Sequence, residues 1–354
     1  MRAFLFALIS LVILTCGNAQ AREPLPPAHT YSIVAYDAEA NQMGVAVQSH
    51  YFSVGPIVPW AETGIGVVAT QSVVEVSYGP LGLDLMRAGK TATQALAGLL
   101  AADEMSQVRQ VAMIDVHGMV AVHTGAMCIP EAGHVSGGSY SCQANLMLSD
   151  TVPDAMARAF EQAEGELAHR MLAAMYAAEA EGGDIRGKQS AALVVVAIKP
   201  SGNRWEDYIY NIRVDDAPEP LPELERLLNI AESYKALNNA AMFAEQGDLD
   251  AAEAEYVRMR ALQPGNAELG FWYATVLLEL SQMEPETEGT EVGNTEEGTP
   301  SYPPELRKRM LQFALAHFAE CFAQAPIWRE IIPRLQAVGR FTEDNELLKL
   351  ILSQ

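Results

Sequence analysis

The apolar pattern of this 354-residue chain changes its character near residue 217. Before that point, short apolar runs of strand length alternate with turn residues and with a few segments of helical periodicity. After it, apolar residues recur only at the three- and four-residue spacing of helices. Residues 215–222, between the halves, are rich in proline and acidic residues, as linkers are. We therefore expect two domains, with sheets only in the first.

In the first half, pairs of apolar runs flank short polar turns and predict antiparallel hairpins. The expected strands are 32–35 with 44–47, 64–69, 110–115 with 119–124, 140–148, and 191–198 with 207–214. The periodicity predicts helices over 80–101 and over 152–181, the latter as one helix or a pair. This order favours a layered α+β fold over a doubly wound parallel sheet.

The charge of the chain restricts its partners. There are 23 Lys and Arg against 45 Asp and Glu, which gives a net charge of −22. Nucleic acids and anionic membrane surfaces are bound by clustered Lys and Arg, so both kinds of partner are disfavoured. The cysteines and histidines have no metal-ligand spacing, and no cofactor motif is found. We expect neither a metal nor a cofactor.

The first 21 residues predict a signal peptide. Arg2 precedes the apolar run 4–14, which is short for a membrane span, and Ala19-Gln20-Ala21 fits a signal-peptidase site. The mature chain would begin with a short segment, 22–29, and would lie outside the cytoplasm, in a bacterial periplasm. It would have no membrane span.

Export would place two of the cysteines in an oxidising compartment. Cys128 and Cys142 lie 14 residues apart in predicted strand and loop. A disulfide closing such a loop contributes about 3 kcal/mol. We therefore predict this pair as a disulfide candidate.

The second half, residues 216–354, contains a repeat. Residues 243–264 match the 34-residue helix–turn–helix pattern of tetratricopeptide repeats. A second unit starts at Trp272, is interrupted by the acidic segment 284–304, and then resumes. Its resumed part, Ala314, Phe318, Cys321 and Pro326, keeps the spacing of Ala252, Tyr256, Met259 and Pro264. Stacked repeats form grooves for peptides or partner proteins; a helical cap on the first domain, or a contact between copies of the chain, is the alternative.

Small polar residues are frequent where the predicted strands of the first half end. They predict either a polar cleft between sheets or strand-end caps, and the residue types alone do not choose between the two. These residues are Thr30, Ser32, 48–50, 70–72, Gln143, Asn145 and 184–190.

The stretch from Thr30 to about Asp215 closely resembles the domain-of-unknown-function family numbered 1028. The matching segments are 30–35, 44–49, 52–55, 69–71, 78–80, 128–130, 182–184 and 186–191. That family looks like a member of the N-terminal-nucleophile hydrolase superfamily. The resemblance implies a four-layer αββα domain over 30–215, followed here by the all-helical domain 216–354, and it implies no particular substrate.

The resemblance also implies a mechanism. In that superfamily the hydroxyl of the first residue attacks an amide carbonyl, and the α-amine of the same residue accepts the proton. Thr30 is then the expected nucleophile, with Gln71 and Asn145 as candidate oxyanion donors. The candidate substrate contacts are Ser49, Asp184, Arg186, Gln189 and Ser190.

The expected function is therefore hydrolysis of an amide bond in a small molecule or a peptide. Signal cleavage after Ala21 would, however, leave residues 22–29 in front of Thr30, and an acylated nitrogen is not a base. Either a second cut occurs between His29 and Thr30, or the domain is a non-catalytic module that binds a ligand or a protein. For Arg186, a simple ion pair with Asp184 competes with a contact to a substrate carboxylate.

Overall fold

The structure is a computed structural model, and it describes residues 29–283 and 302–354. The predicted signal peptide, residues 22–28 and most of the predicted acidic segment lie outside the described residues. Among the helices of the described ranges, none combines the length and the apolar character that a membrane crossing requires. The same ranges contain no cluster of His, Cys, Asp and Glu that would hold a metal ion.

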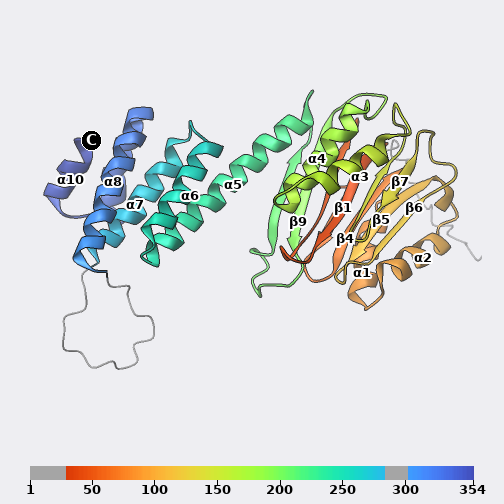
Figure 1. The fold of residues 1–354 in the computed structure, drawn as a ribbon, viewed down its shortest axis with the longest axis horizontal. Coiled ribbons are helices and arrows are strands. Elements are labelled where there is room, and N and C mark those ends of the chain that lie inside the picture. The colour runs from red at the N-terminus through yellow and green to blue at the C-terminus, as the bar shows by residue number, and fades with distance from the viewer. Residues whose placement is uncertain (1–28, 284–301) are drawn as a thin grey trace, which may run out of the picture.

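Two antiparallel sheets form the first half (Figure 1). The strands are β1 (Thr30–Asp37), β2 (Gln42–Ser49), β3 (Pro59–Glu62), β4 (Gly66–Ser72), β5 (Arg109–Asp115), β6 (Val120–Thr124), β7 (Gly133–Ser136), β8 (Tyr140–Ala144), β9 (Ser190–Ala197) and β10 (Tyr208–Val214). One sheet has the order β10-β9-β2-β1-β8-β7 and the other the order β3-β4-β5-β6. Their inner faces meet in an apolar core to which Val34 and Val45 contribute from the first sheet, and Val67 and Ile114 from the second.

Helices cover the outer face of each sheet. α1 (Tyr78–Arg87) and α2 (Ala92–Ala102) pack on the four-stranded sheet. α3 (Val152–Gln162) and α4 (Leu167–Ala180) pack on the six-stranded sheet. The predicted α+β class is confirmed.

The predicted helix over 80–101 is wrong, because the chain there forms two helices. Gly89 has a φ of +84°, and the N–H of Lys90 bonds back to the carbonyl of Leu85, which ends α1. Thr91 then begins α2 with a capping box to Gln94. The prediction also missed β3 and β7, which have only 4 residues each.

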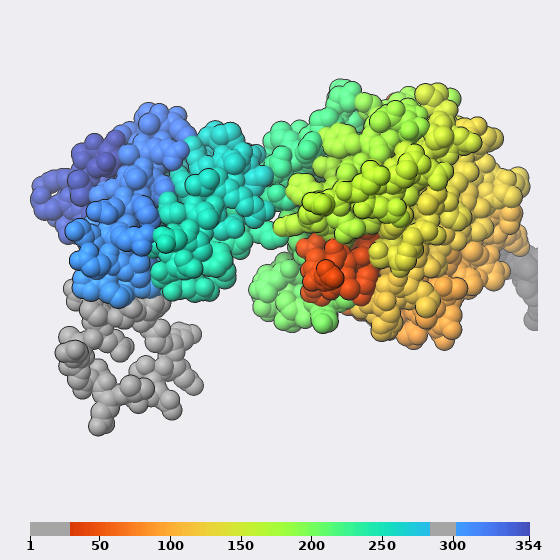
Figure 2. All heavy atoms as spheres, viewed as in Figure 1, coloured from red at the N-terminus to blue at the C-terminus, as the bar shows by residue number. Residues whose placement is uncertain are grey.

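One continuous helix, α5 (Pro220–Glu245), joins the two halves. Its first turns place Leu221, Leu224 and Leu228 in the core beneath the six-stranded sheet. Its later turns place Ala236 and Ala240 in the core of the helical half. The chain thus passes from one core into the other within a single element, and the helical half forms a second lobe at the far end of α5 (Figure 2).

The second half is helical, as predicted. Beyond α5 it contains α6 (Leu249–Leu262), α7 (Ala267–Gln282), α8 (Pro304–Gln324), α9 (Ile332–Gln336) and α10 (Asn345–Leu352), and a 3-10 helix at Pro326–Ile331. α5 packs along α6, and α7 along α8. Phe271 and Tyr273 are fully buried between these helices, whereas Trp272 is 37% exposed.

An ion pair ties α5 to the first half, and we expect it to make stability depend on pH. His169 Nε2 of α4 lies 2.6 Å from Oε1 of the buried Glu232 of α5. The hydrogen bond to Glu232 raises the pKa of His169 above its ordinary 6.5. Burial raises the pKa of Glu232, but His169, Arg258 and Lys235 outweigh burial and bring it below its ordinary 4.5.

The pKa shifts of His169 and Glu232 determine how the stability depends on pH. The contribution of His169 is present below pH 6.5 and is lost as the pH rises through its folded-state pKa, whereas that of Glu232 is lost as the pH falls below 4.5. Glu232→Gln should therefore lower the free energy of unfolding most between these values, by about 1 kcal/mol, because His169 is partly exposed to solvent. Denaturant titrations at pH 5.5 and pH 8.5 measure it, and an equal loss at both would contradict this assignment.

Candidate active site

The space between the two sheets is apolar along most of its length and polar at one end. Alternate residues of β1 face the opposite sheet, so Ser32 and Thr30 continue the face on which Val34 enters the apolar core. Ser32 Oγ donates to Gln71 Oε1 of β4, at 2.6 Å, across the sheets. The side chains of Thr30, Ser32 and Gln71 are fully buried. The alternation thus places a polar cluster where the sequence predicts the nucleophile.

Gln110 of β5 is the centre of this cluster. Its Oε1 accepts hydrogen bonds from Gln71 Nε2 at 2.7 Å and from Asn145 Nδ2 at 2.9 Å. Its Nε2 donates to Thr124 Oγ1 at 2.9 Å and to the carbonyl of Ala144 at 2.8 Å. Because each amide satisfies another, this network determines the orientation of both candidate oxyanion donors.

The two candidate oxyanion donors converge on the backbone of Thr30. Gln71 Nε2 and Asn145 Nδ2 lie 3.2 and 3.3 Å from the carbonyl oxygen of Thr30. The residues that follow them, Ser72 and Leu146, have φ values of +75° and +59°. A left-handed residue other than glycine costs about 1–2 kcal/mol, and such strain persists where the surrounding contacts impose it. Both amides hold the Thr30 carbonyl and do not point into open space.

The carbonyl oxygen of His29, the residue before Thr30, accepts two short hydrogen bonds. Ser49 Oγ donates to it at 2.6 Å, and Arg186 Nη2 donates at 2.7 Å. Thr30 Oγ1 donates in turn to Ser49 Oγ at 3.1 Å. A chain of hydrogen bonds therefore leads from the Thr30 hydroxyl through Ser49 to this carbonyl, on which a guanidinium group also lies. Two such donors polarise a carbonyl in the manner of an oxyanion hole.

Asp184 sets the direction of the Arg186 guanidinium. Its carboxylate is fully buried and accepts from Arg186 Nε at 3.0 Å and from Nη2 at 2.7 Å. It also accepts from the backbone N–H groups of Arg186 and His50. The ion pair that competed with a substrate contact is thus present, and its bidentate geometry directs the guanidinium at His29.

The imidazole of His29 is buried beside Asn145. It is 3% exposed, and its Nδ1 lies 2.9 Å from Asn145 Oδ1. Because Asn145 Nδ2 donates to Thr30 and to Gln110, Oδ1 is the acceptor and His29 Nδ1 carries the proton. Burial lowers the pKa of His29, against the opposing effect of the bond to Asn145. The side chain is therefore a neutral imidazole at pH 7.

Hydrogen bonds, direct or through the Thr30 and His29 carbonyls, connect six of the eight candidate residues, Thr30, Ser49, Gln71, Asn145, Asp184 and Arg186. Ser190 lies opposite Ser49 in the β2–β9 ladder, and the N–H of Gln189 bonds to the Ser49 carbonyl, but the side chains of these two residues serve the local fold. Ser190 Oγ donates to the carbonyl of Tyr51 at 2.5 Å and accepts from the N–H of Val54. Gln189 Nε2 donates to Asp216 at 3.1 Å. Sequence reasoning missed His29 and Gln110, although one adjoins the predicted nucleophile and the other begins a predicted strand.

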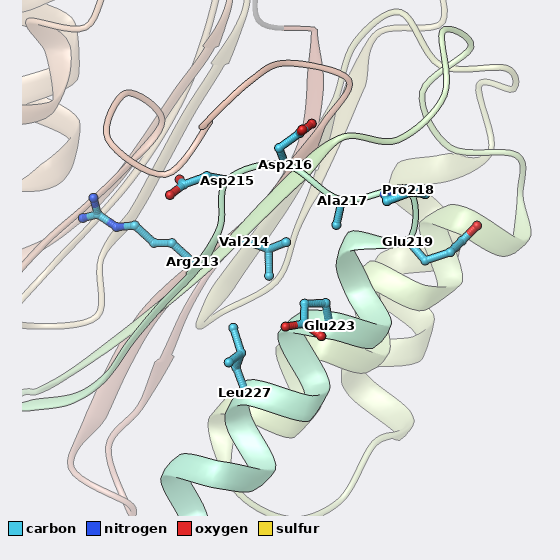
Figure 3. A pocket seen from close by; sticks show the side chains of 9 residues that line it. All are labelled: Arg213, Val214, Asp215, Asp216, Ala217, Pro218, Glu219, Glu223 and Leu227. Carbon is cyan, nitrogen blue, oxygen red and sulfur yellow. The ribbon is translucent and has the colours of Figure 1, made fainter.

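A cavity of about 620 Å³ lies where β10 leads into α5 (Figure 3). It is lined by Arg213, Val214, Asp215, Asp216, Ala217, Pro218, Glu219, Glu223 and Leu227. Gln189 reaches it through its bond to Asp216. Its lining does not include Ser49, Gln71, Asn145 or Arg186, the described side chains that bond to the Thr30 and His29 carbonyls.

The predicted disulfide is wrong, because both cysteines are free. Alternation along β8 directs Cys142 into the core between the six-stranded sheet and its helices. Cys128 Sγ donates instead to the carbonyl of Arg109, the first residue of β5 in the other sheet, at 3.4 Å. Burial raises the pKa of both thiols.

Known proteins similar to this chain share its first half. A solved structure, that of protein SPO2555 from Silicibacter pomeroyi, carries the family label DUF1028 and is 28% identical, with a TM-score of 0.52. The match covers 58% of this chain and 89% of that one. No curated protein matches the chain. The model of the family of unknown function DUF1028 matches residues 30–224, which is more than half of the chain. The chain therefore belongs to the DUF1028 family.

Proposed function

We propose that the first half is an amide hydrolase of the N-terminal-nucleophile type, with Thr30 as its nucleophile, and that it acts after the His29–Thr30 bond has been cut. The observation that carries this proposal is the pair of donors, Ser49 Oγ and Arg186 Nη2, at 2.6 and 2.7 Å from the His29 carbonyl oxygen. Two such donors, one of them a guanidinium that a buried carboxylate holds in place, suit a carbonyl on which negative charge develops. The stacked sheets between helices are in keeping with this superfamily.

The cut follows from the same groups. Thr30 Oγ1 attacks the carbonyl carbon of His29; the Oγ1–C bond forms, the C–N bond breaks, and the hydroxyl proton reaches the Thr30 nitrogen. Ser49 accepts this proton from Thr30 Oγ1 while it donates its own to the His29 oxygen, which gives a tetrahedral intermediate with a hydroxyl group. When the intermediate collapses, the C=O bond re-forms, the proton of that hydroxyl passes to the Thr30 nitrogen and the C–N bond breaks. Water then hydrolyses the ester, which leaves Thr30 with a terminal α-amine. An α-amine has a pKa of about 7.7–8.0 and is a usable base at neutral pH.

The same groups then serve an external amide. The carbonyl of the substrate takes the place of the His29 carbonyl, Arg186 and Ser49 stabilise its oxyanion, and the α-amine of Thr30 carries the proton to the leaving amine. Gln71 and Asn145 position Thr30 through its carbonyl, so their role differs from that expected from the sequence.

Intact-mass measurement of the purified full chain tests this function. We expect a species that begins at Thr30, and no such species for Thr30→Ala, whereas Thr30→Ser keeps a hydroxyl and is cut. The cut protein should release the aminocoumarin from acylated amino-acid coumarin amides, and Thr30→Ala should not. A wild-type chain that keeps its 29–30 bond and has no amidase activity would favour the alternative, a non-catalytic binding module.

We further propose that the chain is exported to the periplasm and that its helical half is tetratricopeptide-like, with a groove for a partner protein. For the repeats, the support is the burial of matching residues on α6 and α8. Ala252 and Tyr256 are buried, as are Ala314 and Phe318 at the same spacing. A partner of this acidic chain would present basic or neutral groups, and its binding would weaken with salt.

A further inference from the structure

We propose that the acyl subsite of this hydrolase selects an acyl residue whose side chain donates a hydrogen bond, so that its substrates are amides of acylated histidine or glutamine. This inference rests on the proposed function and adds to it the class of substrate. The His29 side chain and its acceptor, Asn145 Oδ1, indicate this class.

The cut at residue 29 and the hydrolysis of an external amide pass through the same kind of ester intermediate. When Thr30 Oγ1 attacks the carbonyl of His29, the product is an ester between the histidine acyl group and the Thr30 oxygen. An external amide of histidine would form the same ester at the same atom. The residue that precedes Thr30 therefore occupies the acyl subsite before the first cut, and its side chain identifies the surroundings that a substrate side chain meets.

The surroundings of the His29 side chain offer it a hydrogen-bond acceptor. The imidazole of His29 is 3% exposed, and its Nδ1 lies 2.9 Å from Asn145 Oδ1. Asn145 cannot offer its amide nitrogen instead, because Nδ2 donates to the Thr30 carbonyl at 3.3 Å and to Gln110 Oε1 at 2.9 Å. The Gln110 amide is oriented with Oε1 toward Asn145, because its Nε2 donates to Thr124 Oγ1 and to the carbonyl of Ala144. The subsite therefore presents a fixed acceptor.

The acceptor Asn145 Oδ1 distinguishes acyl side chains that carry an N–H donor from those that do not. A histidine or glutamine side chain brings an N–H to Asn145 Oδ1, whereas leucine or phenylalanine fills space and leaves this buried acceptor without a partner. A site built around a hydrogen bond discriminates strongly against an analogue that lacks the donor. We expect at least about a tenfold preference from this one bond.

Two measurements on the full chain test the subsite. The first follows the 29–30 cut by intact mass in His29→Gln and His29→Leu, which differ little in size and differ in the donor; we expect His29→Gln to be cut about tenfold faster. Circular dichroism and thermal melting establish that both variants are folded. The second uses the self-cleaved wild-type protein with coumarin amides of acetyl-histidine, acetyl-glutamine, acetyl-leucine and acetyl-phenylalanine, and it does not depend on the folding of any variant.

The outcomes separate the two proposals. Higher kcat/KM for the histidine and glutamine amides, by about tenfold, supports the subsite. Equal or higher kcat/KM for the leucine and phenylalanine amides overturns it and leaves Thr30 as the nucleophile. A wild-type chain that is neither cut nor active overturns the subsite and the proposed function together.

Discussion

Replacement of Arg186 by methionine is expected to slow the cut between residues 29 and 30 by about 10²- to 10³-fold, the loss typical of removing one oxyanion donor. Arg186 Nη2 lies 2.7 Å from the His29 carbonyl oxygen, on which negative charge develops when Thr30 attacks. Methionine keeps much of the length and the apolar stem of arginine but offers no N–H. The rate is measured by intact mass over time, and hydrolysis of acetyl-histidine coumarin amide should fall by a similar factor.

Two further variants distinguish the effect of the positive charge at residue 186 from the effect of the orientation of the guanidinium group. Arg186→Lys keeps the positive charge but loses the planar fork that Asp184 holds, so we expect an intermediate rate. Asp184→Asn keeps the size of the side chain and removes the charge that directs the guanidinium, so it should slow the cut by roughly tenfold while Arg186 is retained. Wild-type rates in folded Arg186→Met would show that the guanidinium serves only the local fold.

Replacement of Gln110 by leucine is expected to lower the free energy of unfolding by about 3 kcal/mol, because it leaves several buried groups without partners. Gln110 accepts from Gln71 and Asn145 and donates to the carbonyls of Gly133 and Ala144. Leucine fills much of the same volume, so the effect reports the hydrogen bonds more than the packing. For a domain of this size, the midpoint of thermal unfolding should fall by roughly 6–12 °C.

Gln107→Leu is the matched control for this variant. Gln107 lies three residues earlier and is exposed, so we expect its replacement to change the free energy of unfolding by less than about 0.5 kcal/mol. Gln110→Leu should also slow the cut at residue 29, since it releases the amides that hold the Thr30 carbonyl. A stability equal to that of Gln107→Leu would show that the polar cluster contributes nothing to folding.

The fold of this chain was predictable where local pattern decides it. Strands such as 191–198 appear because β-branched runs between turn residues have few alternatives, and antiparallel neighbours in sequence pair directly. The division of the helical segment near residue 89 was not predicted, because apolar residues keep a helical spacing on both sides, Leu81 and Leu85 before it and Ala95 and Leu99 after it. There a left-handed glycine and the Thr91 cap outweigh helix propensity.

The sequence by itself determined the α+β class and the helical second half, because alternation and short-range spacing carry that information. Its resemblance to a known family, and not its local pattern, singled out most of the residues around Thr30. Only the tertiary structure decided which of those residues meet. Arg186 and Ser49 meet at the His29 carbonyl through contacts that span 157 and 20 residues, and Gln71 and Asn145 meet at the Thr30 carbonyl and at Gln110 of β5. Such meetings depend on which strands pair and which sheets face each other, and no local pattern encodes them. The spacing of Cys128 and Cys142 had suggested a disulfide. The tertiary structure instead places the two cysteines in different surroundings.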